Sequence, residues 1–271
     1  MKKVVTIFIL LFSISSYAQD SIVNYLDYYG EKTKKQNAFS VETIVKRDTV
    51  WERTEYYRTG KIKEKGQYKD KEKSIPSGTF YEFYRDGKVT SYYTYNSVGK
   101  LDGKTEYWFD NNNLSFEGRY SNGAKIGIWK YYHKNGKVAC KQYFQDFKAA
   151  KTVFYDEEGQ KITDDLVKYQ KPKFMGGGFN KFGERISKLH RSIRYQINGI
   201  VYITLTIDVD GKMKNFTTTD KLPKQLLKRL STYFEKIEGW EPAIHMNRKI
   251  PYELTFPLNF RMSFWNRADG E

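Results

Sequence analysis

Cysteine, histidine and proline are all scarce in this chain of 271 residues. The single cysteine, Cys140, has no partner within the chain, so an intrachain disulfide is excluded and the fold must depend on its packed core. The three histidines, His133, His190 and His245, lie far apart, and none has a second ligand at metal-binding spacing. Six prolines are too few for a long proline-rich spacer. We therefore expect neither a metal site nor a stiff extended segment.

The sequence motifs that usually mark catalysis are missing as well. Gly176-Gly177-Gly178 is not followed by the Lys-Ser or Lys-Thr of a phosphate-binding loop, and no serine lies in a Gly-x-Ser-x-Gly elbow. Asp208-Val209-Asp210-Gly211 is similar to the start of a calcium loop, but the downstream glutamate is absent and a hairpin turn explains the motif fully. We expect no catalytic residues, no cofactor and no bound metal, and we predict that the protein is not an enzyme.

The N-terminus has the layout of a secretory signal peptide. Met1-Lys2-Lys3 precedes an apolar stretch from Val4 to Ile14, and Ser16-Tyr17-Ala18 places small residues before a cleavage point at Gln19. The apolar stretch is shorter than the about 20 residues of a transmembrane helix. We therefore expect residues 1–18 to be removed on export to the periplasm or outer envelope. Retention of this segment as an anchor is the alternative.

The chain is strongly basic, with 47 lysines and arginines against 32 aspartates and glutamates, a net charge of +15. Basic charge together with 17% aromatic residues is typical of nucleic-acid binding, but export argues against that partner. An envelope protein with this charge meets anionic lipid headgroups or acidic proteins instead. The alternative is that lysine only keeps a tyrosine-rich sheet soluble and protects its edges.

A repeat with a period of 23 to 27 residues occupies the middle of the chain. Gly78 to Gly87 and Gly127 to Gly136 both read Gly-x-aromatic-x-x-aromatic-x-x-x-Gly. Degenerate copies run from Gly103 to Asn112 and from Ala150 to Gly159, and a partial copy runs from Tyr56 to Gly60. Such a period is typical of stacked copies of one small unit.

Each repeat predicts a β-hairpin. Asp86-Gly87 and Asn135-Gly136 lie between aromatic runs, and glycine there accepts the positive φ of a tight turn. Asn112 replaces that glycine in the third copy, which asparagine tolerates. Because a lone hairpin cannot bury its apolar face, we expect residues 50–165 to form one antiparallel sheet. Before it, residues 19–49 predict a helical capping segment, since Ile22, Tyr25, Leu26 and Tyr29 have helical spacing.

The form Gly-x-Trp-x-x-Tyr-x-x-x-Gly at Gly127 to Gly136 resembles the MORN-type repeat variant of bacterial YwqK-family proteins, which carry an antitoxin label. The resemblance covers roughly residues 50 to 165. It implies a sheet used for binding or scaffolding, without catalytic residues.

The C-terminal part predicts a compact α+β domain at 176–264, after a linker at 166–175 and before a tail at 265–271. Apolar residues at helical spacing predict helices at 182–193 and 223–237, and alternation predicts strands at 200–209, 212–218 and 252–264. The expected fold class is therefore α+β, mainly antiparallel β: a hairpin array followed by two helices packed on a three-stranded sheet.

Residues 173–262 resemble the C-terminal domain of TonB-type energy transducers, in the form common in Bacteroidetes. The matching elements, in order, are Phe174 with Gly176-Gly177, Gly199, Asp208-x-Asp210-Gly211, Gly239-Trp240-x-Pro242-Ala243 and Phe256-Pro257-Leu258-x-Phe260. Met175 departs from the family, because many relatives have proline there. As a whole, the chain resembles exported Bacteroidetes proteins that join MORN-type repeats to a TonB-like domain.

The resemblance implies recognition by strand addition, in which a peptide of an outer-membrane transporter pairs with the last strand of the domain. Carried over to this chain, the partner-binding residues are Tyr252, Leu254, Phe256, Leu258 and Phe260. We therefore expect a non-enzymatic envelope protein that binds a protein partner. The alternatives are a genuine TonB-type energy transducer for outer-membrane transport and an anionic-lipid-binding repeat protein.

Overall fold

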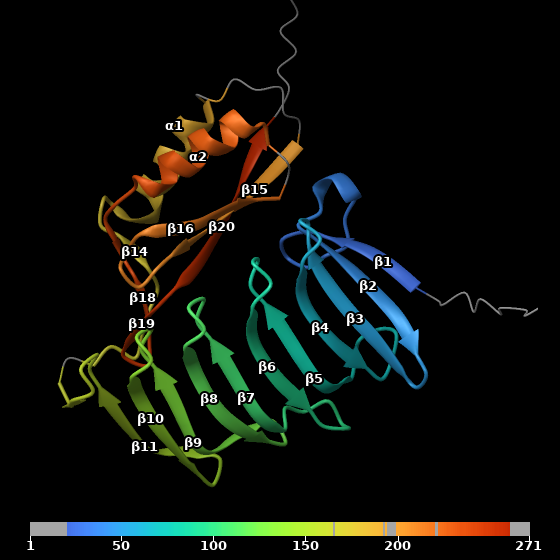
Figure 1. Cartoon of the computed structure of the whole chain (residues 1–271), viewed down its shortest axis with the longest axis vertical. Helices are drawn as coiled ribbons and strands as arrows, with labels where there is room; N and C mark the ends of the chain where they lie inside the picture. The colour runs from blue at the N-terminus through green and yellow to red at the C-terminus, as the bar shows by residue number, and fades with distance from the viewer. Residues whose placement is uncertain (1–20, 165, 192, 194–198, 220–221, 261–271) are drawn as a thin grey trace, which may run out of the picture.

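A computed structural model describes residues 21–164, 166–191, 193, 199–219 and 222–260; of His190, Asn259 and Phe260 it describes only the backbone. The expected signal peptide and the C-terminal tail lie outside these residues. Figure 1 shows a long curved sheet, with a smaller α+β unit above the hairpin turns at one end of its strands. We call the sheet the hairpin array and the smaller unit the C-terminal module.

Among the described residues, the hairpin array contains twelve antiparallel strands paired in chain order. Each strand therefore pairs with its neighbours in sequence, as the turn residues predict, and the expected fold class is confirmed. The strands are β1 (Ser21–Leu26), β2 (Ser40–Arg47), β3 (Val50–Tyr57), β4 (Ile62–Tyr68), β5 (Pro76–Phe83), β6 (Val89–Tyr95), β7 (Gly103–Trp108), β8 (Leu114–Ser121), β9 (Ala124–Tyr132), β10 (Val138–Gln145), β11 (Lys148–Tyr155) and β12 (Lys161–Ile162).

The N-terminal segment is a correction to the sequence analysis, because residues 21–26 and 40–47 form strands and the expected helix is absent from them. Only a single 3-10 turn, Lys35–Asn37, lies between these strands. The spacing of Ile22, Tyr25, Leu26 and Tyr29 fits a helix, but Ile22 and Leu26 alone, four residues apart, also fit one face of a strand. Pairing of β1 with β2 then decides the outcome, since β2 gives β1 a complete hydrogen-bonding partner. The segment caps the array as its terminal strands.

Neighbouring repeats fit together because large and small side chains face each other. A Cβ atom at Gly66 would overlap the ring of Phe80, and a Cβ atom at Gly118 would overlap the ring of Trp129. Both rings are almost fully buried. The glycines therefore form the seats into which the aromatic rings of the next strand pack. We call the face of the array that carries Phe80 and Trp129 the inner face.

The two degenerate copies show the reverse combination. At the positions equivalent to the two glycines stand Tyr93 and Gln142, and the residues that would carry the large ring are Thr105 and Thr152. Gln142 lies directly opposite Thr152, and the Thr105 hydroxyl donates to the carbonyl of Tyr92 at 3.0 Å. The two threonines therefore have a structural reason. Tyr93 and Gln142 already fill the space that a glycine leaves for a ring, so a small residue is needed beside each of them.

Side chains also bond each hairpin turn to the next one. At three of four consecutive steps a ring side chain reaches a backbone carbonyl of the following repeat. The Tyr57 hydroxyl donates to the carbonyl of Phe83 at 2.8 Å, the Tyr84 hydroxyl donates to that of Trp108 at 2.8 Å, and His133 Nε2 contacts that of Tyr155 at 3.0 Å. Phe109 occupies the equivalent position between Tyr84 and His133 and has no polar group. Phe109 therefore leaves the carbonyl of Tyr132 without this side-chain contact.

The described part of the C-terminal module has two helices and a sheet in the order β16-β15-β20. Shorter strand pairs join β13 to β18 and β19, and β14 to β17. The elements are β13 (Tyr169–Gln170), β14 (Lys173–Phe174), α1 (Gly178–Arg191), β15 (Gly199–Ile207), β16 (Met213–Thr218), α2 (Lys224–Glu235), β17 (Trp240–Glu241), β18 (Ala243–His245), β19 (Arg248–Ile250) and β20 (Tyr252–Phe260).

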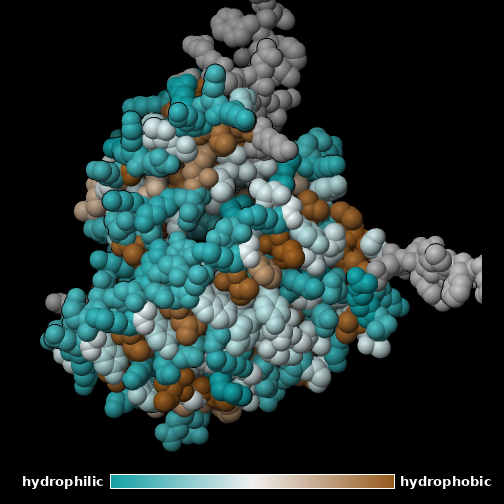
Figure 2. All heavy atoms as spheres, in the orientation of Figure 1, coloured by the Kyte–Doolittle hydropathy of each residue, from teal (hydrophilic) through white to brown (hydrophobic). Residues whose placement is uncertain are grey.

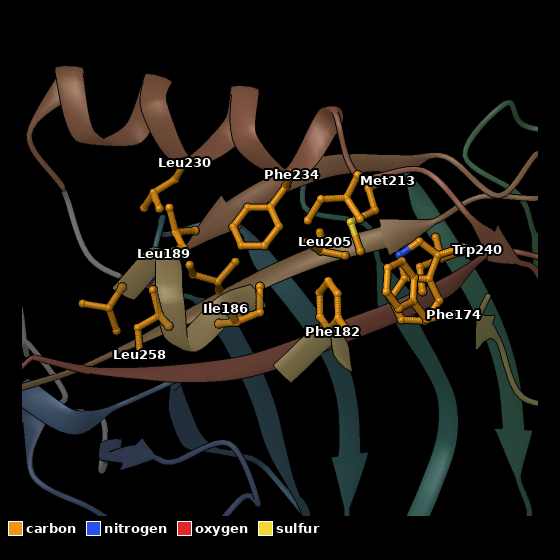
Figure 3. Packing of buried hydrophobic residues seen from close by; sticks show 14 of the residues in the cluster. Phe174, Phe182, Ile186, Leu189, Leu205, Met213, Leu230, Phe234, Trp240 and Leu258 are labelled. Atoms are coloured by element: carbon orange, nitrogen blue, oxygen red, sulfur yellow. The ribbon is translucent and has the colours of Figure 1, made fainter. Parts of the chain in front are cut away.

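The core of the module lies between α1, α2 and one face of this sheet (Figure 3). Val201, Ile203, Leu205 and Ile207 of β15 are each at most 2% exposed. Burial of one such side chain stabilises the fold by about 1.5–3 kcal/mol. The apolar side chains predicted to alternate along this strand are therefore those that face the two helices. The helices contribute Phe182, Ile186 and Leu189 from α1, and Leu226, Leu230 and Phe234 from α2.

The segment expected as a linker, residues 166–175, is instead part of the module. Tyr169 and Gln170 pair with β18, and Lys173 and Phe174 pair with β17. Phe174 is buried against the ring of Trp240, with ring centroids 5.0 Å apart. An aromatic residue that completes a core explains why this stretch is ordered onto the module.

The outer surface is mostly hydrophilic on the side shown in Figure 2, where hydrophobic residues form small separate patches. This agrees with the basic, lysine-rich composition. In the described residues, no helix is long and apolar enough to cross a membrane.

Candidate functional site

The last strand, β20, lies at an edge of the module sheet (Figure 1). It pairs with β15 at nine successive positions, from Gly199 opposite Phe260 to Ile207 opposite Tyr252. No described strand pairs with its other side. An unpaired edge presents a row of backbone donors and acceptors, which is the feature that strand addition requires.

The register shows which backbone groups of β20 face outward. Tyr202 donates its N–H to the Thr219 hydroxyl at 3.0 Å, and its carbonyl accepts from the Thr219 N–H at 3.0 Å, so both of its polar groups point toward β16. In antiparallel sheets this direction alternates along a strand, and two residues directly opposite each other either both face one another or both face away. Pro257 lies opposite Tyr202. The backbone of Pro257, like that of Thr255 and Glu253, therefore faces the free edge.

The side chains of the predicted partner-binding residues lie on the helix side of the sheet. Leu258 is 3% exposed, and Leu254 and Phe256 are partly buried against the same core. Tyr252 begins the strand and is half-buried, and only the backbone of Phe260 is described. The backbone groups of these five residues point toward β15. A strand added at the free edge would bond to the residues between them.

The residues that sequence reasoning missed are therefore Glu253 and Thr255. Their N–H groups face the free edge, and the side chain of Glu253 is 56% exposed. Pro257 was the available signal, since a proline in a strand is tolerated where its missing N–H faces away from the neighbouring strand. It also removes one donor from the edge. The segment able to accept a partner is consequently the first half of β20.

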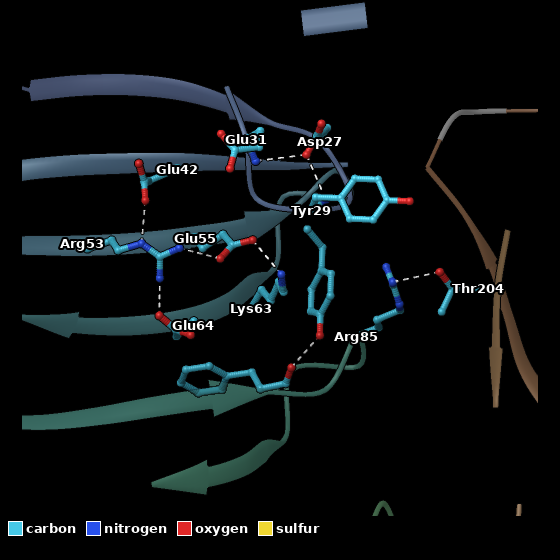
Figure 4. A network of polar contacts seen from close by, with 12 residues as sticks. Asp27, Tyr29, Glu31, Glu42, Arg53, Glu55, Lys63, Glu64, Arg85 and Thr204 are labelled. Carbon is cyan, nitrogen blue, oxygen red and sulfur yellow. Dashed lines mark hydrogen bonds and ion pairs between the residues drawn. The ribbon is translucent and has the colours of Figure 1, made fainter. Parts of the chain in front are cut away.

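The face of the module sheet that the helices leave free lies over the hairpin turns of the array. Arg85 donates to the Thr204 hydroxyl at 3.3 Å (Figure 4). It also lies 3.9 Å from a carboxylate oxygen of Glu253. The ring of Tyr28 stacks on Tyr202, with centroids 5.9 Å apart. β15 thus rests on turns from several repeats, and the first half of β20 lies beside the turn that contains Arg85.

A buried ion pair joins the other end of β15 to the array. Lys134 Nζ lies 2.7 Å from a carboxylate oxygen of Asp208, and Lys214 contacts the other oxygen at 2.6 Å. Burial alone would raise the pKa of Asp208, but the hydrogen bonds from both lysines hold it below its ordinary value. Asp208 also begins the hairpin turn that ends at Gly211, where a Cβ atom would overlap the carbonyl oxygen of Trp240. The Asp-x-Asp-Gly motif is therefore structural.

Arg248 on β19 docks the module on the third repeat. Its Nη1 donates to the Ser115 hydroxyl at 3.2 Å and to the carbonyl of Tyr132 at 3.0 Å. The guanidinium lies over the rings of Phe109 and Tyr131, 5.5 and 5.7 Å from their centroids. Burial lowers its pKa to about 10. A buried arginine without a carboxylate partner among the described residues is costly, so the aromatic rings and the two acceptors must stabilise it.

An ion network lies on the inner face of the array (Figure 4). Arg53 binds Glu42 at 2.6 Å, Glu55 at 2.7 Å and Glu64. Glu42 is fully buried, and its pKa is held down by hydrogen bonds from Lys73, Arg53 and Asn24 against the opposing effect of burial.

The described residues offer little for catalysis. They contain no group of three or more histidine, cysteine or acidic side chains that could hold a metal ion. Cys140 is fully buried, and burial raises the pKa of its thiol to about 12, so it is not a nucleophile near neutral pH. His133 bonds to the array backbone and His245 packs on Tyr131.

Three segments of the chain, residues 52–70, 76–97 and 125–146, match the family model of the MORN repeat variant. Repeats of this family are commonly involved in binding and interaction, and the family is not known for catalysis. The match confirms the MORN-type repeat predicted from Gly127 to Gly136. The degenerate copies lie outside the matched segments, yet they form the same hairpins, β7 with β8 and β11 with β12. No curated protein matches the chain.

Proposed function

We propose that this chain is a non-enzymatic interaction protein of the cell envelope, in which β20 accepts an extended segment of a partner protein by strand addition. The observation that carries the proposal is the outward direction of the Glu253 and Thr255 backbone at an unpaired sheet edge, derived from the register with β15. The hairpin array serves as the scaffold that holds this edge. Its hydrogen-bonded turns and buried rings give the module a rigid base.

The energetics of such a contact come mainly from the backbone. Each hydrogen bond to an added strand contributes about 0.5–1.5 kcal/mol, and the side chains on either face of the added strand supply specificity. Because Pro257 donates no hydrogen bond, an added strand gains most beside Glu253 and Thr255. The same proline discourages uncontrolled pairing of two such edges.

The test is Thr255→Pro, which removes an outward N–H and leaves the backbone bonds to β15 in place. It also removes the Thr255 hydroxyl, which lies 3.0 Å from that of Thr204, and Thr255→Ala controls for this loss. A photo-crosslinking amino acid at position 253, in cells, is expected to capture an extended segment of an envelope protein in the parent chain. Thr255→Pro should abolish this crosslink, whereas Thr255→Ala, which keeps the N–H, should preserve it. Equal crosslinking in all three proteins would contradict strand addition.

Export and anchoring are tested by the mass of the mature chain. We expect a product that begins at Gln19 in the periplasmic or outer-envelope fraction. A full-length chain in the inner membrane would instead support the TonB-type transducer, which needs an anchor to draw energy from an inner-membrane motor.

A second candidate function, attachment to an anionic membrane, is favoured by the hairpin ends on the side of the array opposite the module. Ile75, Val98 and Phe147 are 40%, 66% and 67% exposed at three of these ends. Phe147 has a φ of +63°, a conformation that bulky residues rarely adopt. Exposed lysines, among them Lys100 and Lys148, lie beside these side chains in sequence. Each lysine near an anionic surface contributes about 1 kcal/mol.

Vesicle flotation tests this second function. Vesicles with phosphatidylserine should bind the protein, pure phosphatidylcholine vesicles should not, and salt should weaken the binding. Val98→Ser with Phe147→Ser should release the protein. Tyr29→Ser, which changes an exposed aromatic residue on the opposite side of the array, is the matched control. Binding that is unaffected by salt and by the double substitution would exclude this membrane contact.

A further inference from the structure

Four glutamates form a continuous row on the inner face of the array. Glu42 lies directly opposite Glu55, Glu55 opposite Glu64, and Glu64 opposite Glu82, across strands β2 to β5. Residues directly opposite each other in an antiparallel sheet have side chains on the same face, and like charges there are destabilising. Such a row requires cations to compensate it.

The compensation is incomplete at one end of the row. Arg53 contacts the first three carboxylates, and Lys63 and Lys73 reach Glu55 and Glu42. Glu82 accepts hydrogen bonds only from the hydroxyls of Ser91 and Tyr93, at 2.8 and 3.3 Å, and has no ion-pair partner within the described part of the chain. Burial, Glu82 and Glu55 together raise the pKa of Glu64, against the opposing effect of Arg53.

The unpaired end of the row is connected to the first half of β20 through Tyr57 and Arg85. Tyr57 donates to the carbonyl of Phe83, the residue after Glu82, at 2.8 Å. The Arg85 guanidinium lies 4.5 Å from the centroid of the Tyr57 ring and 3.9 Å from a carboxylate oxygen of Glu253. The pKa of Tyr57 is raised to about 12, mainly by burial and also by Glu253, Glu55 and Glu82, against the opposing charge of Arg85. Burial likewise raises the pKa of Tyr107 to about 12, again with contributions from Glu82 and Glu253. The two carboxylates therefore act on the same two phenols, although one belongs to the array and the other to the module. Glu253 is the residue whose backbone faces the free edge.

The local charge balance differs from that of the whole chain. Five carboxylates, those of the row and Glu253, face four cations, Arg53, Lys63, Lys73 and Arg85. The chain as a whole carries +15. A basic segment is repelled by most of the surface and attracted here, and such contrast gives specificity more than affinity.

We infer that the segment accepted by β20 is basic, with lysine or arginine at the alternate positions that face the array. The inference rests on the proposed strand addition and names the chemistry of its partner. Side chains of an added strand alternate between its two faces, so one set lies toward the helices and the other toward Glu253 and Glu82. Cations in the second set supply the charge that the glutamate row lacks.

A phage-displayed library of random ten-residue peptides, panned on the whole protein, tests this inference. We expect enrichment of peptides with lysine or arginine at every second position. Glu82→Gln with Glu253→Gln should weaken an enriched peptide about tenfold relative to its glutamine-substituted version. Glu52→Gln with Glu117→Gln, which removes the same charge elsewhere on the array, should not. Circular dichroism confirms that each variant is folded.

Each outcome decides between the two ideas. Enriched peptides that lack alternate basic residues, or that bind the Glu82 and Glu253 variant unchanged, would overturn the basic partner. If these enriched peptides no longer bind the Thr255→Pro variant, strand addition itself is supported and only the basic chemistry of the partner is overturned. Basic peptides that bind Thr255→Pro normally would instead overturn strand addition, and so would failure to enrich any peptide.

Discussion

Arg248 donates a hydrogen bond to the carbonyl of Tyr132 at the step of the array where Phe109 has no polar group with which to reach it. At the steps on either side, Tyr84 and His133 contact the equivalent carbonyls themselves. The C-terminal module therefore supplies, from β19, a bond that the repeat does not make. This contact fixes the place at which β19 docks on the array.

Phe109→Tyr should release the module from this place. The new hydroxyl reaches the Tyr132 carbonyl as its neighbours do, and it occupies the position of the guanidinium. We expect faster amide hydrogen exchange at Ala243–His245 and Arg248–Ile250, with the array unchanged. Tyr84→Phe, the opposite exchange at a step without Arg248, is the control and should not release these strands. Protection of β18 and β19 that is equal in both variants would refute the docking role.

Gly118→Ala should destabilise the array, because the added methyl group overlaps the buried ring of Trp129. We expect a loss of about 1–3 kcal/mol in the free energy of unfolding, measured in urea. Gly183→Ala is the matched control, since a Cβ atom there meets no atom within 4 Å in helix α1. That change should be neutral or stabilise by about 0.4–1 kcal/mol. Equal effects at the two glycines would show that ring packing does not matter.

Asp208 should make stability depend on pH in the acid range. Its pKa in the folded chain lies below the ordinary value of 3.8, so its contribution is fully present above that value and is lost as the pH falls below it. Asp208→Asn should therefore cost stability at pH 6, and the difference from the parent chain should shrink as the pH falls below about 4. Thermal unfolding across this range measures it. A difference that stays constant with pH would rule out the charged contact with Lys134.

Two proline substitutions, one residue apart in β20, should have opposite consequences for folding. Leu254→Pro removes an N–H that faces β15 and disturbs the core, so the module should lose about 3 kcal/mol or more of stability. Thr255→Pro removes an outward N–H, and the module should stay folded. Near-ultraviolet circular dichroism and thermal melting of the two variants give the answer. Similar melting temperatures would mean that the register of β20 was assigned wrongly.

Much of the fold is predictable because the turn residues act locally. Asp86-Gly87 and Asn135-Gly136 favour tight turns wherever they occur, and alternation along β15 needs only its neighbours in sequence. The N-terminal strands were missed because four apolar or aromatic residues from Ile22 to Tyr29 have helical spacing, and pairing with β2 overrides that local pattern. The β18–β19 hairpin was missed for a different reason. Its turn has positive φ at Met246 and Asn247, without the glycine that usually marks such a turn.

The sequence predicts which strand forms the candidate site, but it does not predict which residues of that strand face the free edge. The sequence indicates that β20 is an edge, through Pro257, but whether a backbone N–H faces inward or outward depends on register with β15. The glutamate row was hidden for a related reason. Register shifts at Glu55, Lys65 and Glu82 change which residues share a face, so alternation along one strand does not predict neighbours on the next.

Large rings packed on glycines alternate along the array with threonines packed beside larger residues, and this alternation limits how the number of hairpins can change. Gly66 and Gly118 each receive a ring, and Tyr93, between them, faces a threonine. Loss of a single hairpin would bring Tyr93 against Trp129, or leave a glycine seat empty beside a threonine. Loss or duplication of two adjacent hairpins would keep every seat matched to its ring. The unit that can be gained or lost without disturbing the packing is therefore a pair of hairpins, and related arrays should differ in length by even numbers of repeats.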